Sequence, residues 1–132
     1  MEPVEEIVSK MDEIMSDVGS MILLQIHIQK GDTNPSDLLL KIQKPEILER
    51  EKELGKYVFI AWSSKLGEVE ARPLQLCKNG IYEGEWRKGK EKRVGKGKLY
   101  RPNGSTYEGW WYNDLPYGQG RNIYSSLSVY QG

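Results

Sequence analysis

The chain has 132 residues, with 19 basic side chains, 19 acidic side chains and a single cysteine. This length fits one ordinary domain, the zero net charge gives no general attraction to nucleic acid or membranes, and a lone cysteine excludes an intrachain disulfide. We expect an intracellular, cytoplasmic protein, because a lone cysteine favours a reducing compartment and the acidic start MEPVEEIVSK does not have the charge pattern of a targeting peptide. We also expect no cofactor.

The charges divide the chain into two regions. Residues 1–56 hold 7 basic and 12 acidic side chains, whereas residues 57–132 hold 12 basic and 7 acidic ones. The first region is predicted to be mainly helical and the second to be rich in strands, as the patterns below indicate. The fold class we predict is α+β, with an N-terminal helical and strand region followed by an antiparallel β-meander.

Two elements are predicted in the first 30 residues. Apolar side chains recur at helical spacing from Val4 to Val18, which predicts an amphipathic helix that ends near Gly19. This helix suits packing on the protein's own sheet and docking to a partner helix equally well. Residues 21–30 then alternate between apolar and polar side chains, which predicts a half-buried strand.

Two short helices and two strands follow. Ser36 or Asp37 is placed to cap a helix through LLLKIQK, and Pro45 begins a second helix that ends at Gly55. The aromatic and β-branched run YVFIAW at 57–62 predicts a strand, with ARPLQLC at 71–77 as its partner.

An aromatic and glycine pattern is then repeated. Both copies contain a Tyr-x-Gly-x-Trp run followed by a Gly-x-Gly pair. The first copy has Tyr82, Gly84, Trp86, Gly95 and Gly97, and the second has Tyr107, Gly109, Trp111, Gly118 and Gly120. Tyrosine, glycine and tryptophan at alternate positions lie on one face of a strand, so two rings flank a position that has no side chain. That gap allows an aromatic ring to lie against the backbone. We therefore expect one hairpin per repeat, stacked side by side.

The stretch YEGEWRKG, with VGKGKLYRPNGSTYEGWW and YGQG, resembles the MORN (membrane occupation and recognition nexus) repeat over residues 79–132. Two MORN-type repeats fall at about 82–104 and 107–127, and a truncated third falls at 128–132. Three departures from the pattern stand out. The insertion KEKRV lengthens the first hairpin loop, and Asp114 and Leu127 replace glycines. An aspartate still suits a turn, whereas a leucine puts the second repeat's last turn in doubt.

The resemblance implies a twisted β-meander that acts as a scaffold or as a dimerisation and docking module. Proteins with such repeats include ciliary radial-spoke subunits, junctophilins, parasite cytoskeletal proteins, lipid kinases and a class of lysine methyltransferase. We therefore expect a non-catalytic scaffold or adaptor subunit of a larger intracellular assembly, with a ciliary or cytoskeletal one favoured. A regulatory fragment of a lipid kinase or methyltransferase is an alternative.

Two features are candidates for partner binding. Val129, Tyr130 and Gly132 begin a third repeat, and the strand edge that they would form suits the addition of a partner strand after Gly132. The alternative at this place is that the sequence is a piece of a longer protein. Trp110 alternates with Gly109 and Trp111, so it faces away from the aromatic series, and we expect it to be exposed as a contact for a partner.

A basic run lies between the two copies. Its cationic residues are Arg87, Lys88, Lys90, Lys92, Arg93, Lys96 and Lys98. Such a run suits anionic lipid, which gives the second alternative function, a peripheral membrane module; a solvated hairpin loop explains it as well. Nucleic acid is disfavoured, because the run has no aromatic side chain on which bases would stack.

Catalytic and metal-binding roles find little support in the sequence. His27 and Cys77 would give at most an incomplete metal site. Glu83, Glu85 and Glu108 share one face and are expected to form ion pairs with lysines across strands. We expect a protein that is not an enzyme.

Overall fold

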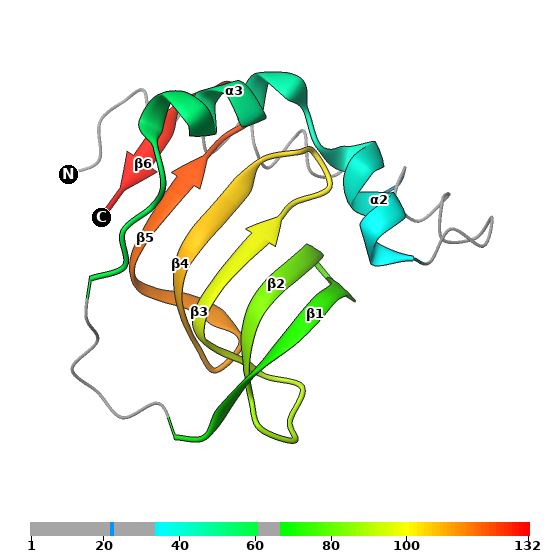
Figure 1. Cartoon of the computed structure of the whole chain (residues 1–132), viewed down its shortest axis with the longest axis vertical. Helices are drawn as coiled ribbons and strands as arrows, with labels where there is room; N and C mark the ends of the chain where they lie inside the picture. The colour runs from blue at the N-terminus through cyan, green and yellow to red at the C-terminus, as the bar shows by residue number, and fades with distance from the viewer. Residues whose placement is uncertain (1–21, 23–33, 61–66) are drawn as a thin grey trace.

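The computed structural model describes residues 22, 34–60 and 67–132. Two short helices precede six strands, and the strands form one antiparallel sheet in the order β1-β2-β3-β4-β5-β6 (Figure 1). The predicted α+β class and β-meander are therefore confirmed. The predicted helix at residues 4–18 lies outside the described residues. Ile22 is helical, so the predicted strand at 21–30 is wrong at the one position of that segment that is described.

Helix α2 spans Pro35–Ile42, and helix α3 spans Pro45–Leu54. The predicted caps of α2 are wrong, because Asn34 caps this helix: its Oδ1 accepts hydrogen bonds from the backbone N–H groups of Ser36 (2.9 Å) and Asp37 (3.3 Å). The predicted start of α3 at a proline and its end before Gly55, which has φ of 78°, are confirmed.

The strands are joined by short turns. Their bounds are Val69–Cys77 for β1, Gly80–Arg87 for β2, Arg93–Tyr100 for β3, Thr106–Tyr112 for β4, Leu115–Ile123 for β5 and Val129–Gln131 for β6. The predicted strand at 71–77 is confirmed within β1. Its predicted partner is wrong, because β1 pairs with β2, and residues 57–60 of the run YVFIAW are not in a strand.

The two faces of the sheet carry different side chains. On one face, which we call the aromatic face, a buried cluster contains Tyr82, Trp86, Leu99, Tyr107 and Trp111. On the opposite face, which we call the helix face, Ile81 of β2 packs with Leu38 and Ile42 of α2. Helix α2 contacts β1, and α3 contacts β5 (Figure 1).

The first and second repeats close with equivalent turns. In the first, the Gly104 N–H donates to the Arg101 carbonyl (2.8 Å), and Gly104 has φ of 90°. In the second, the Leu127 N–H donates to the Tyr124 carbonyl (2.8 Å), and Leu127 has φ of 73°. The last turn therefore forms even though a leucine holds the left-handed position that glycine normally takes.

This strain predicts a stabilising substitution. Leu127→Gly is expected to raise the free energy of unfolding by about 0.5–1 kcal/mol, because a side chain in the left-handed region costs about 1–2 kcal/mol and glycine's greater freedom in the unfolded chain offsets part of the gain. Leu127 is 38% exposed, so its side chain loses only part of its packing, and the Leu127→Ala variant measures that loss. Urea denaturation measures the change, and Leu127→Ala is the control, because alanine keeps the strained backbone. An equal gain in both variants would show that backbone strain is not the cause.

Candidate functional site

The aromatic face is built in the same way in both repeats. The Tyr82 ring lies directly over Gly97, and the Tyr107 ring lies over Gly120, so close that a Cβ on either glycine would meet the ring. Each tyrosine hydroxyl donates to the carbonyl three residues later, Tyr82 to Glu85 (2.8 Å) and Tyr107 to Trp110 (2.9 Å). The predicted clearance at the glycines in the second strand of each repeat is confirmed, because an aromatic ring lies against the backbone at Gly97 and at Gly120.

Edge-to-face ring contacts link the two repeats. The Tyr82 ring centroid lies 5.2 Å from that of Trp86 and 5.1 Å from that of Trp111, and Tyr107 lies 5.4 Å from Trp111. Burial raises the pKa of Tyr107 to about 12 and raises that of Tyr82 as well, so both hydroxyls stay protonated and donate. This face therefore has the features of an architectural core rather than those of a ligand groove.

Trp110 lies on the helix face, as strand alternation predicts, but the expectation that it is exposed is wrong. Only 8% of the residue is exposed. Its Nε1–H donates to the Ile60 carbonyl (2.7 Å), and its ring packs edge-to-face on Phe59 at 5.6 Å. The extended segment 57–60 covers this tryptophan, so a partner does not reach its ring in this arrangement.

The predicted basic run does not form one surface. Arg93 is 1% exposed and is held by Asp114: its Nε–H donates to Asp114 Oδ1 (2.7 Å), and its Nη2 donates to the Asp114 carbonyl (3.0 Å). Lys98 pairs with Glu51 of α3 (2.7 Å), and the Lys96 ammonium lies 5.3 Å from the Phe59 ring. Carboxylates of the chain already pair with both Arg93 and Lys98 in this arrangement.

The rest of the run lies at the β2–β3 hairpin. Lys88, Lys90 and Lys92 are exposed there, and Arg87 is half-buried. Acidic side chains accompany them, since Lys88 lies 3.9 Å from Glu68, and Glu91 pairs with Arg72 at 3.2 Å. The hairpin end thus keeps three exposed lysines, and their charge is partly balanced.

A row of alternating charges crosses the helix face. Glu83, Lys98, Glu108 and Arg121 lie directly opposite one another on β2, β3, β4 and β5. The predicted pairing of the glutamates with lysines across strands is only partly correct. Glu108 pairs with Arg121 (3.8 Å) instead, and Glu85 accepts from the Lys96 backbone N–H (2.7 Å).

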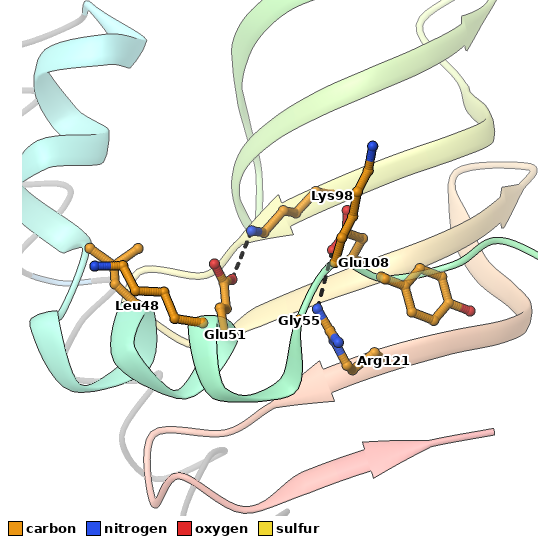
Figure 2. A pocket seen from close by; sticks show the side chains of 9 residues that line it. Leu48, Glu51, Gly55, Lys98, Glu108 and Arg121 are labelled. Atoms are coloured by element: carbon orange, nitrogen blue, oxygen red, sulfur yellow. Dashed lines mark ion pairs between the residues drawn. The ribbon is translucent and has the colours of Figure 1, made fainter.

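Helix α3 and the segment after it enclose part of this row in a pocket of about 440 Å³. Figure 2 shows Glu51 of α3 reaching toward Lys98, and Glu108 beside Arg121. The pocket is lined by Leu48, Glu51, Lys52, Gly55, Lys56, Tyr57, Lys98, Glu108 and Arg121. Sequence reasoning missed this site. The only sign of it in the sequence is that Glu108 and Arg121 have opposite charges on neighbouring strands. That sign can be recognised only once the register of β4 and β5 is known.

The surroundings stabilise the charged forms of Lys98 and Asp114 and the neutral form of Tyr57. Burial alone would lower the pKa of Lys98, but the hydrogen bond from Lys98 to Glu51 raises it. Burial and the nearby Glu108 carboxylate raise the pKa of Tyr57, which keeps this phenol neutral. Burial would raise the pKa of Asp114, but the hydrogen bonds and charge of Arg93 lower it.

The strand β6 leaves much of β5 uncovered. It pairs with Arg121–Ile123, and Gly132 exchanges two hydrogen bonds with Gly120 (3.1 and 3.3 Å). The outer edge of residues 115–119 has no strand partner among the described residues. This edge offers backbone groups to a further strand.

Among the described residues, no three His, Cys, Asp or Glu side chains gather as metal ligands would. None of the described helices has the length and apolar character needed to cross a membrane. Comparison with protein-family models, with curated proteins and with solved structures gave no match to the chain.

Proposed function

We propose that this protein is a non-catalytic scaffold or adaptor subunit that uses MORN-type repeats to bind other proteins in a larger intracellular assembly, ciliary or cytoskeletal. The observation that carries the proposal is the outer edge of β5 and β6. The outer edge of β6 and that of residues 115–119 of β5 have no strand partner among the described residues, and the ladder between β5 and β6 ends at the pair Gly120 and Gly132. A strand from a partner would continue the sheet there.

The equivalence of the two hairpins supports the MORN-type assignment. In both, a tyrosine ring covers a glycine of the next strand, and its hydroxyl binds a carbonyl three residues on. The same turn closes both units, at Gly104 and at Leu127. Within the sheet, each strand pairs only with the strands that precede and follow it, which is the property that lets repeat proteins extend.

The side chains at this edge also suit a protein partner. Leu115 is 63% exposed, Tyr117 is 57% exposed and Tyr130 is 38% exposed. Tyrosines are enriched at protein interfaces, because they combine a large apolar area with a polar end. A partner strand beside the outer edge of β5 would lie next to Leu115 and Tyr117, and one paired with β6 would lie next to Tyr130.

A proline at position 131 tests the edge without breaking the ladder. Because Gly132 and Gly120 bond to each other in both directions, alternation directs the Gln131 N–H away from β5, toward an added strand. Gln131→Pro removes that donor and obstructs a partner strand, while the hydrogen bonds between β5 and β6 remain. Gln131→Ala keeps the donor and is the matched control.

We expect tagged wild-type protein, purified from the cells that make it, to appear in native mass spectra in fixed stoichiometry with one or more proteins. The Gln131→Pro variant should lose these partners, whereas Gln131→Ala should keep them. Partner recovery that is equal in the two variants would exclude the outer edge of β6 as the docking site. The absence of any stoichiometric partner of the wild-type protein would count against the scaffold function itself.

The alternative of a peripheral membrane module has weaker support. It depends on the hairpin end, where Lys88, Lys90 and Lys92 are exposed but Glu68 and Glu91 lie among them. Each basic side chain near an anionic surface contributes only about 1 kcal/mol, so three partly balanced lysines give weak attachment.

A further inference from the structure

The pocket beneath α3 contains an arginine with unused donors. The Arg121 side chain is only 6% exposed, and its nearest carboxylate oxygen, Glu108 Oε1, is 3.8 Å away. This distance allows an ion pair but is too long for a hydrogen bond. No hydrogen bond of the Arg121 guanidinium is found within the part of the chain that the structure describes, although this group has five N–H donors.

The surroundings hold this guanidinium in place. The Arg121 Cζ lies 5.6 Å from the centroid of the Tyr57 ring, and Glu108 is its direct neighbour across the strands. These contacts offset part of the burial of a charge and leave the N–H groups available to a ligand. Arginine at such a place binds planar oxyanions, because its parallel N–H groups match the two oxygens of a carboxylate.

The charges in the pocket favour a ligand with a single negative charge. Four cationic side chains line the pocket, Lys52, Lys56, Lys98 and Arg121, against the two carboxylates of Glu51 and Glu108. Glu51 already binds Lys98 at 2.7 Å, and Lys52 pairs with Glu49 at 3.3 Å, so Arg121 and Lys56 remain for a ligand. The carboxylate of Glu108 would repel a second negative charge close to Arg121.

The other walls are apolar or lack a side chain. Leu48 of α3 and the Tyr57 ring supply apolar surface, and nothing lies within 4 Å of the place where a Cβ of Gly55 would be. The volume of about 440 Å³ falls in the range of sites that take small organic molecules. Figure 2 shows the charged groups of α3 and of the sheet around this space.

We propose that this pocket binds a small monocarboxylic acid with an apolar or aromatic body. The carboxylate would accept hydrogen bonds from the Arg121 guanidinium, with Lys56 adding positive charge at the mouth, and the apolar body would lie between Leu48 and the Tyr57 ring. This site lies on the helix face, apart from the outer edge to which the proposed scaffold function assigns partner binding, and the inference does not rest on that function.

The test is an NMR titration of the full chain with benzoate, with benzamide as the neutral probe of similar shape and phenyl phosphate as the probe with greater negative charge. We expect saturable shifts at the backbone amides of Tyr57, Glu108 and Arg121 with benzoate at millimolar concentration. Benzamide should bind about tenfold more weakly or not at all, because it lacks the charge that strengthens hydrogen bonds to arginine.

Variants separate the pocket from general attraction by positive charge. Arg121→Gln should weaken benzoate binding by about tenfold or more, whereas Lys90→Gln, which removes the same charge at the hairpin end, should leave it unchanged. Arg121→Lys keeps the buried charge and serves if Arg121→Gln does not fold. It should still weaken binding several-fold, because it lacks the planar pair of donors.

Three results would overturn the proposal. These are the absence of saturable shifts around Arg121, binding of benzamide equal to that of benzoate, and benzoate binding that Arg121→Gln or Arg121→Lys leaves intact. Tighter binding of phenyl phosphate would also overturn the assignment to a monocarboxylate, and it would point to a phosphate ester instead.

Discussion

Gly97→Ala is expected to lower the free energy of unfolding by about 3 kcal/mol, the upper end of the usual cost of overpacking a core. An added Cβ at position 97 would collide with the Tyr82 hydroxyl oxygen and with ring carbons of the same side chain. Tyr82 is fully buried between Trp86 and Trp111, so its ring has little room to move away. Urea denaturation followed by tryptophan fluorescence measures the loss.

Two comparisons tie this effect to the ring. Gly132→Ala is the matched control, because the nearest atom to its added Cβ is 3.4 Å away, and it should change stability by less than about 0.5 kcal/mol. Combined with Tyr82→Ala, Gly97→Ala should cost much less than it does alone, because the obstructing ring is gone. Additive effects of the two substitutions would contradict the close approach of Tyr82 to Gly97.

Asp114→Asn is expected to destabilise the protein by about 2–3 kcal/mol at neutral pH. The substitution leaves the buried Arg93 guanidinium without its charged partner, and hydrogen bonds to charged groups contribute about 1.5–3 kcal/mol. Asparagine tolerates the left-handed backbone of position 114, where φ is 70°, so the turn itself is preserved. Glu83→Gln is the control, because this glutamate is exposed, and it should have almost no effect.

The same pair predicts a pH dependence of stability. The pKa of Asp114 is lower in the folded protein than in the unfolded chain, because the Arg93 interactions outweigh the effect of burial. The unfolded state therefore binds the proton more readily. The stabilising contribution is complete above the unfolded pKa and is lost as the pH falls through the folded pKa. The difference in the free energy of unfolding between the wild type and Asp114→Asn should therefore become smaller at acidic pH. A difference that does not change with pH would exclude this linkage.

The meander could be predicted because its cause is local. Tyrosine, glycine and tryptophan at alternate positions define one face of a strand, and their repetition after Tyr107 defines the next hairpin. The ring of Tyr82 over Gly97 follows from that pattern, and the structure confirms it. The first hairpin loop is longer, as the insertion KEKRV predicts, and β3 begins at Arg93.

The errors arise where the partner of a segment is distant in the sequence. The run YVFIAW has the composition of a strand, but its residues 57–60 are extended without being part of the sheet, and the Ile60 carbonyl accepts from Trp110. Composition reports that such a segment is extended and apolar; it does not report what the segment covers. For the same reason Trp110 was assigned to the correct face but was expected to be exposed.

The pocket and the burial of some cations of the basic run could not be predicted either, because both depend on contacts between residues that are distant in the sequence. Arg93 and Lys90 look alike in the sequence, yet Arg93 meets Asp114, which is 21 residues away, and is buried. Lys98 meets Glu51 from a helix that precedes the sheet. Charge patterns show how many cations a segment has, whereas tertiary pairing decides how many of them remain for a ligand.

The sequential strand order also bears on how the chain reaches its fold. Each strand pairs with the strands that precede and follow it, so the sheet needs no contact between its first and last strands to form. Closing the short loop of a hairpin costs little conformational entropy. Proteins rich in such local contacts fold faster than sheets of the same size whose strands are joined by crossovers. The meander can therefore form hairpin by hairpin, beginning at whichever turn closes first.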